Sequence, residues 1–213
     1  MTGLRARQKA DREQRILRAA AEQFRQVGYE RARIETIAAL AEVSPGTVYN
    51  YYENKGDLLV AIVAMEVNEV LNAGAVLVAD PPGDVARAVN ELISIYLDHS
   101  LVYLSKEMWR NAMAITTQQP ETRFGRAYNQ LDVRLAKQVC GLIARLQAAG
   151  LVRPAVDADA VGEMVFNNTN MMFTIFVKQD QMSLDSLKAT IARQNAPLLQ
   201  AIRADLAAAA GPG

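Results

Sequence analysis

Apolar residues recur at helical spacing along almost the whole chain, and this pattern restricts what the chain can fold into. In the first segment, Ile16, Ala20, Phe24 and Val27 follow one another at intervals of four, four and three residues, which places them on one face of a helix. No long segment shows the alternation of apolar and polar residues that is typical of a strand. The sequence therefore predicts an all-α fold of about nine helices.

Capping residues, glycines and prolines set the expected boundaries of these helices. We expect helices over residues 9–27, 34–41 and 45–52, a fourth capped by Asn54, a fifth opened by Asp84 after Pro81-Pro82-Gly83, then 103–115, 121–149, one from the Asp157 cap to 178, and one from the Ser183 cap onward. Residues 116–120 are predicted as a loop, Pro197 is predicted to kink the last helix, and the tail from Ala207 is expected to be frayed.

The bulk composition is that of an ordinary globular protein. The chain has 213 residues, of which 51% are hydrophobic and 22% charged. Its single cysteine, Cys140, lies in an apolar helical pattern and is read as a small buried residue rather than a reactive thiol. Without a disulfide framework, a secretory signal or a run of 18 apolar residues, the sequence predicts a cytoplasmic protein with no membrane span.

Charge is unevenly distributed, although the net charge is zero. Residues 1–33 hold nine Lys/Arg and four Asp/Glu, a net charge of +5, so the remainder carries −5. A basic N-terminal segment suggests contact with a polyanion, whereas a merely solvated arginine-rich helix is an equally good explanation. Charge alone does not decide between them.

Residues 34–52 form a predicted helix-turn-helix. Two short helices are joined by the turn Glu42-Val43-Ser44, and such a unit can place its second helix in a major groove about 12 Å wide. Val48 and Tyr52 are four residues apart and share the inner face. Because Tyr49, Tyr51 and Tyr52 cannot all point the same way on a helix, one or two of them are exposed, which favours a contact role over a purely core role.

At these residues the chain resembles the TetR family of transcriptional regulators. The resemblance rests on Thr36-Ile37-Ala38, then the run from Ala41 to Tyr52, then Asn54-Lys55 and Leu58-Leu59, and it covers roughly residues 10–60. Two positions depart from the family pattern. Glu42 replaces the usual turn glycine, and Gly56 replaces the acidic residue that is common after the lysine.

The resemblance implies DNA contacts at nine positions: Arg33, Thr36, Pro45, Gly46, Thr47, Tyr49, Asn50, Tyr51 and Lys55. It also implies that Tyr52 is a core residue. The arm from Arg5 to Arg12 is a further candidate for phosphate or minor-groove contacts, although such arms are often disordered.

The rear half is expected to supply dimerisation and ligand binding. The helix over 157–178 is apolar on more than one face, which implies a partner across a dimer or within the chain; the resemblance implies a homodimer through the last two helices. The candidate effector-binding residues, although side chains in such patterns are more often ordinary core, are Tyr96, His99, Tyr103, Met108, Trp109, Met113, Tyr128, Phe166, Asn167 and Asn170.

These assignments predict a helix-turn-helix DNA-binding domain at residues 1–54, a ligand-binding and dimerisation domain at 55–207 and a disordered tail at 208–213. The predicted partners are double-stranded DNA, a second copy of the chain and a small-molecule effector. The resemblance favours a repressor released from a palindromic operator when the effector shifts the fourth helix. The sequence contains no phosphate loop, metal-ligand cluster or nucleophile elbow, so a helical enzyme or a protein-binding adaptor is the lesser alternative and no cofactor or metal is expected.

Overall fold

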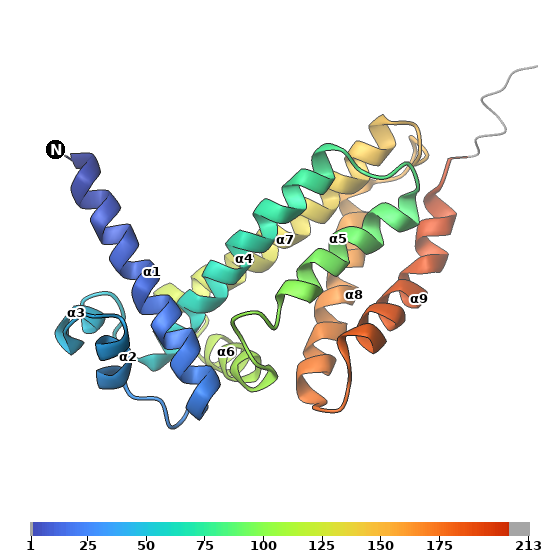
Figure 1. Ribbon diagram of the computed structural model, residues 1–213. Helices are drawn as coiled ribbons and strands as arrows, with labels where there is room; N and C mark the ends of the chain where they lie inside the picture. The colour runs from blue at the N-terminus through green and yellow to red at the C-terminus, as the bar shows by residue number, and fades with distance from the viewer. Residues whose placement is uncertain (1, 205–213) are drawn as a thin grey trace, which may run out of the picture. The chain divides into compact units, whose positions relative to one another are not determined.

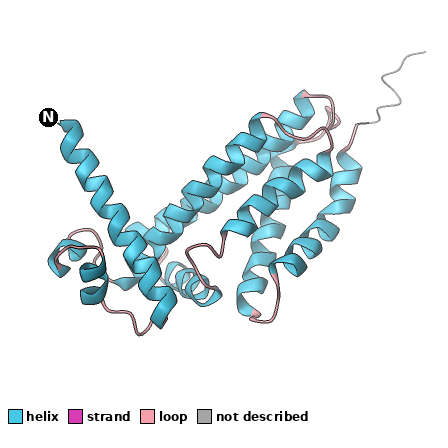
Figure 2. Cartoon of the chain, in the orientation of Figure 1, coloured by secondary structure: helices cyan, strands magenta, loops and turns pink. Residues whose placement is uncertain are grey.

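The computed structural model describes residues 2–204, and their regular secondary structure is helical (Figure 2). The helices are α1 (Thr2–Val27), α2 (Ile34–Leu40), α3 (Pro45–Tyr49), α4 (Lys55–Ala79), α5 (Val85–His99), α6 (Lys106–Gln118), α7 (Arg123–Ala148), α8 (Ala158–Lys178) and α9 (Leu184–Ile202). One isolated β-bridge joins Val152 and Arg203. The predicted all-α fold is confirmed.

The chain forms two compact units. The first unit comprises Met1–Glu66 and Ser100–Asn129, and the second comprises Val67–His99 and Gln130–Gly213. Helices α4 and α7 each contribute their first part to the first unit and the rest to the second. The predicted domain boundary between residues 54 and 55 stays a prediction, and the predicted disordered tail at 208–213 lies outside the described residues.

In the first unit, the apolar stripe of α1 is buried as its spacing predicts. Ile16, Ala20 and Phe24 are almost completely inaccessible to solvent. Helix α1 packs against α2, and α2 packs against α3 (Figure 1). Ile37 of α2 and Val48 of α3 are both fully buried.

Predicted helix caps are confirmed at the starts of α3, α4, α8 and α9. The side chain of Ser44 accepts a hydrogen bond from the backbone N–H of Thr47, and Asp157 and Ser183 cap α8 and α9 in the same way. Asn54 Oδ1 accepts from the N–H of Asp57 at 3.0 Å. Short polar side chains before apolar runs were therefore reliable boundary signals in this chain.

The predicted bounds of three helices were wrong. Helix α3 ends at Tyr49 instead of Tyr52. Helix α1 begins at Thr2 instead of Lys9, because its polar residues are strong helix formers even where no apolar stripe marks them. Helix α6 spans Lys106–Gln118 instead of 103–115, because Ser105 caps its start. The predicted loop at 116–120 therefore begins in a helix, where Thr116 and Thr117 donate their hydroxyls to the carbonyl groups of Ala112 and Met113.

In the second unit, α8 packs against α9, and the two helices lie side by side in Figure 1. Asn168 Nδ2 donates to Asn195 Oδ1 at 2.9 Å across this contact. Helices α7 and α8 approach closely at Gly162, where a Cβ atom would lie 2.5 Å from Cα of Cys140. Cys140 is buried, as predicted. Pro197 lies within α9, and the predicted kink stays a prediction.

Helix α4 is the described helix whose length and apolar composition would allow it to cross a membrane. Half of its most apolar window is buried inside the protein. Leu58, Leu59, Ile62 and Val63 are completely or almost completely buried, as in the core helix of a globular protein.

Candidate nucleic-acid interface and effector residues

The recognition helix α3 is held by its buried and capping residues, which leaves its other face to solvent. Val48 is fully buried, and the hydroxyl groups of Ser44 and Thr47 lie 2.9 Å apart in a hydrogen bond. Pro45, Gly46, Tyr49 and Asn50 are exposed, and half of the Tyr49 surface is accessible. A short helix with an exposed, hydrogen-bonding face fits the major-groove role expected from the sequence.

The three neighbouring tyrosines have different environments. Tyr49 is exposed, Tyr51 is half-buried, and Tyr52 is buried as predicted. The Tyr51 hydroxyl donates to the carbonyl oxygen of Lys9 at 3.4 Å, and the Lys9 ammonium lies 5.9 Å from the Tyr51 ring centroid. The Tyr52 hydroxyl donates to Glu13 Oε1 at 3.2 Å. Burial, and then the adjacent Glu13 carboxylate, raises the pKa of Tyr52.

Lys55 is anchored within the first unit. Its Nζ donates to the carbonyl oxygens of Tyr29 at 3.0 Å and Glu30 at 2.8 Å, and it lies 5.0 Å from the centroid of the Tyr29 ring. An ammonium has three N–H donors, and these two bonds use two of them. Lys55 therefore stabilises the loop before α2, and its contact with DNA stays a prediction.

The remaining predicted DNA contacts lie at the start of α2 and on α1. Arg33 and Thr36 are exposed, and Arg33 occupies the N-cap position of α2 without a side-chain capping bond. Arg7, Lys9 and Arg12 are exposed on α1, so the expected arm is helical over its described residues. The side chain of Arg5 lies outside what the structure describes. DNA contact by all of these residues stays a prediction.

The ten predicted effector residues divide equally between the two units. Tyr103, Met108, Trp109, Met113 and Tyr128 belong to the first unit, and Tyr96, His99, Phe166, Asn167 and Asn170 belong to the second.

In the first unit the indole N–H of Trp109 donates to the carbonyl oxygen of Ser100 at 2.6 Å, and Met108 is fully buried. Tyr103, Met113 and Tyr128 are partly buried. These placements are those of well-packed side chains, and an effector contact by any of them stays a prediction.

In the second unit several polar side chains are paired between helices. The Tyr96 hydroxyl donates to Gln138 Oε1 at 2.7 Å, and Nε2 of His99 lies 3.4 Å from Oε2 of Glu69. Burial raises the pKa of Tyr96. Phe166 is buried, whereas Asn167 is exposed on α8. No group of three or more His, Cys, Asp or Glu side chains gathers as metal ligands among residues 2–204.

Sequence reasoning missed Asp132, the partner of Asn170. Asn170 Nδ2 lies 3.4 Å from Asp132 Oδ2, and burial raises the pKa of Asp132 to about 6. A sequence signal was present, because Asp132 follows Tyr128 by four residues and therefore shares the inner stripe of α7. A carboxyl group on an apolar helix stripe marks a position that can recognise a polar ligand group.

Comparison with known proteins identifies the first unit. Residues 16–62 match the family described as bacterial regulatory proteins, tetR family. This match includes α2, the turn, α3 and the start of α4, whose geometry is given above. Residues 16–62 are therefore a DNA-binding region of the TetR family of bacterial regulatory proteins.

Similarity to known regulators extends over most of the chain. The fatty acid metabolism regulator protein of Bacillus subtilis is 20% identical over 175 residues, which is 82% of this chain and 88% of that protein. A putative TetR-family regulator from Mesorhizobium loti has a TM-score of 0.69 at 20% identity, covering 92% of this chain and 98% of that one. Thermus thermophilus FadR, a TetR-family repressor solved with lauroyl-CoA, has a TM-score of 0.66 at 20% identity, covering 88% and 93%.

Both departures from the TetR pattern have structural consequences. Glu42 adopts φ = 54°, the one positive φ at a non-glycine position among the described residues, which explains why glycine is usual in this turn. A Cβ atom at Gly56 would lie 3.2 Å from Cδ1 of Ile115. Glycine therefore lets α6 approach the backbone of α4, and a larger residue would push Ile115 away.

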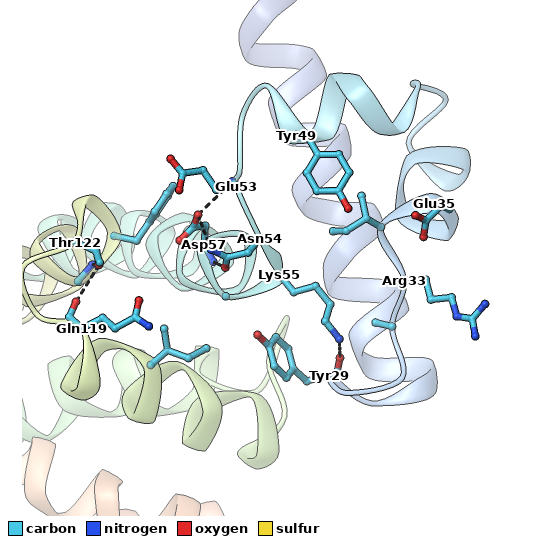
Figure 3. Close-up of a pocket in the computed structure, with 16 residues that line it drawn as sticks. Tyr29, Arg33, Glu35, Tyr49, Glu53, Asn54, Lys55, Asp57, Gln119 and Thr122 are labelled. Atoms are coloured by element: carbon cyan, nitrogen blue, oxygen red, sulfur yellow. Dashed lines mark hydrogen bonds between the residues drawn. The ribbon is translucent and has the colours of Figure 1, made fainter.

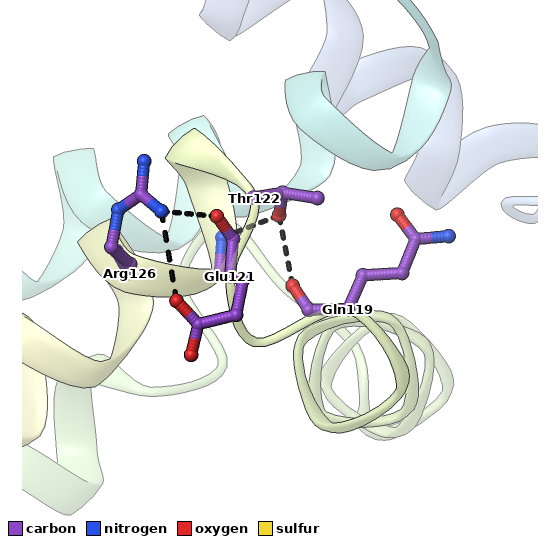
Figure 4. A network of polar contacts seen from close by, with 5 residues as sticks. Gln119, Glu121, Thr122 and Arg126 are labelled. Carbon is purple, nitrogen blue, oxygen red and sulfur yellow. Dashed lines mark hydrogen bonds and ion pairs between the residues drawn. The ribbon is translucent and has the colours of Figure 1, made fainter.

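The turn between α6 and α7 is a second feature that sequence reasoning missed. Thr122 donates its hydroxyl to the carbonyl oxygen of Gln119 at 2.9 Å and accepts from the N–H of Gly125 at 3.0 Å (Figure 4). Arg126 forms an ion pair with Glu121 at 3.7 Å. A Cβ atom at Gly125 would lie 2.2 Å from the Gln119 carbonyl oxygen, so this turn requires glycine.

Proposed function

We propose that this chain is a TetR-family repressor that binds a palindromic operator as a homodimer and is released from it by a small-molecule effector. The observation that carries this proposal is the exposed, hydrogen-bonding face of α3, which Val48 and Tyr52 anchor from behind. The nine predicted DNA contacts are the proposed interface. A regulator of this kind acts in the cytoplasm, where the chromosome is.

The outward face of α8 supports dimerisation. Met164 and Met171 are 58% and 61% exposed, although both are large apolar side chains. They are seven residues apart on one helix face, with the exposed Asn167 between them. Covering this face with α8 of a second copy would remove both methionines from water, and a two-fold dimer presents two recognition helices to a palindromic site.

The effector is proposed to bind in the second unit, near the buried polar groups of α5, α7 and α8. Tyr96, Asp132 and Asn170 supply hydrogen-bonding groups in largely apolar surroundings, which is the usual make-up of a small-molecule site. Because FadR of Thermus thermophilus was solved with lauroyl-CoA, acyl-CoA thioesters are the first effectors to test.

Release requires that the effector prefer the conformation that does not bind DNA. Helix α4 carries Lys55 at its start and continues to Ala79, so a displacement of its second part is the proposed route to the recognition helix. To shift the ratio of DNA-binding to non-binding conformations from 99:1 to 1:99, the effector must bind the non-binding conformation more tightly by about 5.5 kcal/mol.

A fluorescence-anisotropy titration tests the proposal. The intact chain is titrated into labelled duplexes from the DNA flanking its own gene, at several salt concentrations. We expect one duplex to bind in competition with bulk DNA, as two chains per duplex, with affinity that falls steeply with salt. Lauroyl-CoA is then added to the complex. The absence of saturable binding to any duplex at low salt would refute the proposal.

A further inference from the structure

A cleft of about 580 Å³ lies within the first unit, close to the recognition helix. Its walls come from the loop and start of α2, from Tyr49 on α3, from the start of α4 and from the α6–α7 turn (Figure 3). None of the ten predicted effector residues lines it. Its size is within the range of about 300–1,000 Å³ that is typical of small-molecule sites.

More carboxylates than cationic side chains line this cleft. Glu35, Glu53 and Asp57 line it, together with Arg33 and Lys55. The Lys55 ammonium is held by two backbone carbonyl groups. Figure 3 shows the Arg33 guanidinium pointing away from Glu53 and Asp57. The side of the cleft formed by the start of α4 is therefore negatively charged.

Asp57 shows that this side is partly shielded from water. Burial raises the pKa of its carboxyl group, although the N–H of Glu53 and the amide of Asn54 each donate to Asp57 Oδ2 at 3.2 Å. Desolvation therefore outweighs both hydrogen bonds. A positive charge placed nearby would stabilise the carboxylate.

Two aromatic rings that line the cleft, Tyr29 and Phe124, already lie near cationic side chains, although Arg123 is not itself part of the lining. The Lys55 ammonium lies 5.0 Å from the centroid of the Tyr29 ring, and the Arg123 guanidinium lies 5.4 Å from that of Phe124. Tyr49, which is half exposed, and Ile115 complete this surface. Aromatic rings attract organic cations through their negative faces, and aliphatic side chains accept apolar substituents.

We propose that this cleft binds a small organic monocation, with its charge near Glu53 and Asp57 and its apolar substituents against Ile115 and the aromatic rings. Arg33, Tyr49 and Lys55 line the same cleft and are also predicted DNA contacts. An occupant would therefore compete with DNA directly at the reading unit. This site is separate from the effector site proposed in the second unit.

Titration calorimetry with tetraphenylphosphonium tests the site on the full chain without DNA, so its result does not depend on the proposed function. We expect saturable binding of one cation per chain, and binding of the isosteric anion tetraphenylborate at least tenfold weaker. Equal or tighter binding of the anion would overturn the proposal.

Two charge-removing variants locate the binding site. Glu53→Gln and Asp57→Asn should each weaken tetraphenylphosphonium binding about fivefold, because each removes one nearby negative charge. Glu121→Gln, which removes an exposed carboxylate that does not line the cleft, should leave the affinity unchanged. If Asp57→Asn does not fold, Glu53→Gln decides the question alone. Unchanged affinity in Glu53→Gln would place the cation elsewhere and overturn the proposal.

Discussion

Phe124, the second residue of α7, packs its ring against that of Tyr52, with 6.1 Å between the ring centroids. Tyr52 lies three residues after the end of the recognition helix and is hydrogen-bonded to Glu13 of α1. The start of α7 therefore supports the recognition helix from behind. This contact lies entirely within the first unit.

Replacing Phe124 by leucine should loosen this support. Loss of the aromatic pair is expected to lower the free energy of unfolding by about 1 kcal/mol and to weaken DNA binding, because Tyr52 would no longer be fixed. Urea denaturation and anisotropy with the identified duplex measure the two effects. Phe124→Tyr, which keeps the ring, serves as the control, and unchanged stability of the leucine variant would show that the pair is unimportant.

Lys55→Ala should affect both folding and DNA binding, because the ammonium is bonded to the carbonyl groups of Tyr29 and Glu30. We expect a loss of about 1 kcal/mol in stability and, if the third N–H holds a phosphate, a decrease of about 1 in the salt dependence of DNA binding. A salt dependence in Lys55→Ala equal to that of the wild type would rule out the phosphate contact. Tyr49→Phe serves as a comparison, because it should weaken DNA binding without changing stability.

The sequence predicted the elements whose ends carry local signals. Ser44, Asn54 and Asp157 cap helices where expected, because a short polar side chain bonds to the backbone within three residues. Helix α1 began earlier than expected because polar helix formers leave no apolar stripe. The outward face of α3 was likewise predictable from the spacing of Val48 and Tyr52.

Contacts between residues distant in sequence could not be predicted in this way. Phe124 reaches Tyr52 across more than 70 residues, and no local pattern indicates that pairing. The cleft lined by Tyr49 could not be predicted for the same reason, because its walls come from four segments that meet only after folding. Asp132 differs, since its place on an apolar stripe was visible and its partner Asn170 had already been predicted as a polar site.

Glu42→Gly should stabilise the helix-turn-helix. Glu42 has φ = 54°, a conformation that costs a residue with a side chain roughly 1 kcal/mol and glycine little. The substitution also removes a negative charge beside the predicted DNA surface, so DNA binding should become tighter, especially at low salt. Thermal unfolding and anisotropy measure these changes. Glu42→Gln is the matched control, because it removes the charge but keeps the strained backbone and should therefore improve binding without improving stability.

Asp132→Asn should change how stability depends on pH. The pKa of Asp132 rises from 3.8 to about 6 on burial, so the ionised carboxylate opposes folding. Below about pH 4 the side chain is protonated and burial carries no charge penalty. As pH rises to about 6, the carboxyl group's contribution to the free energy of unfolding is lost, and this loss amounts to at most roughly 3 kcal/mol. We expect the asparagine variant to be more stable than the wild type at pH 7.5 and similar to it at pH 4. Urea denaturation at both pH values decides this, and an equal difference at both would exclude titration of Asp132 as the cause.

The contact between α7 and α8 should tolerate no added carbon at Gly162. A Cβ atom there would lie 2.5 Å from Cα and 2.6 Å from the backbone nitrogen of Cys140, and backbone atoms cannot rotate away as a side chain can. Gly162→Ala is therefore expected to lower the free energy of unfolding by about 1–3 kcal/mol, despite the higher helix propensity of alanine. Gly141→Ala is the matched control, because Gly141 lies in α7 next to Cys140 and its Cβ would meet nothing within 4 Å. Gly141→Ala should raise the free energy of unfolding by up to about 1 kcal/mol. Urea denaturation should therefore show effects of opposite sign for the two variants. Stabilisation of both variants would mean that α7 and α8 can separate at this point without cost.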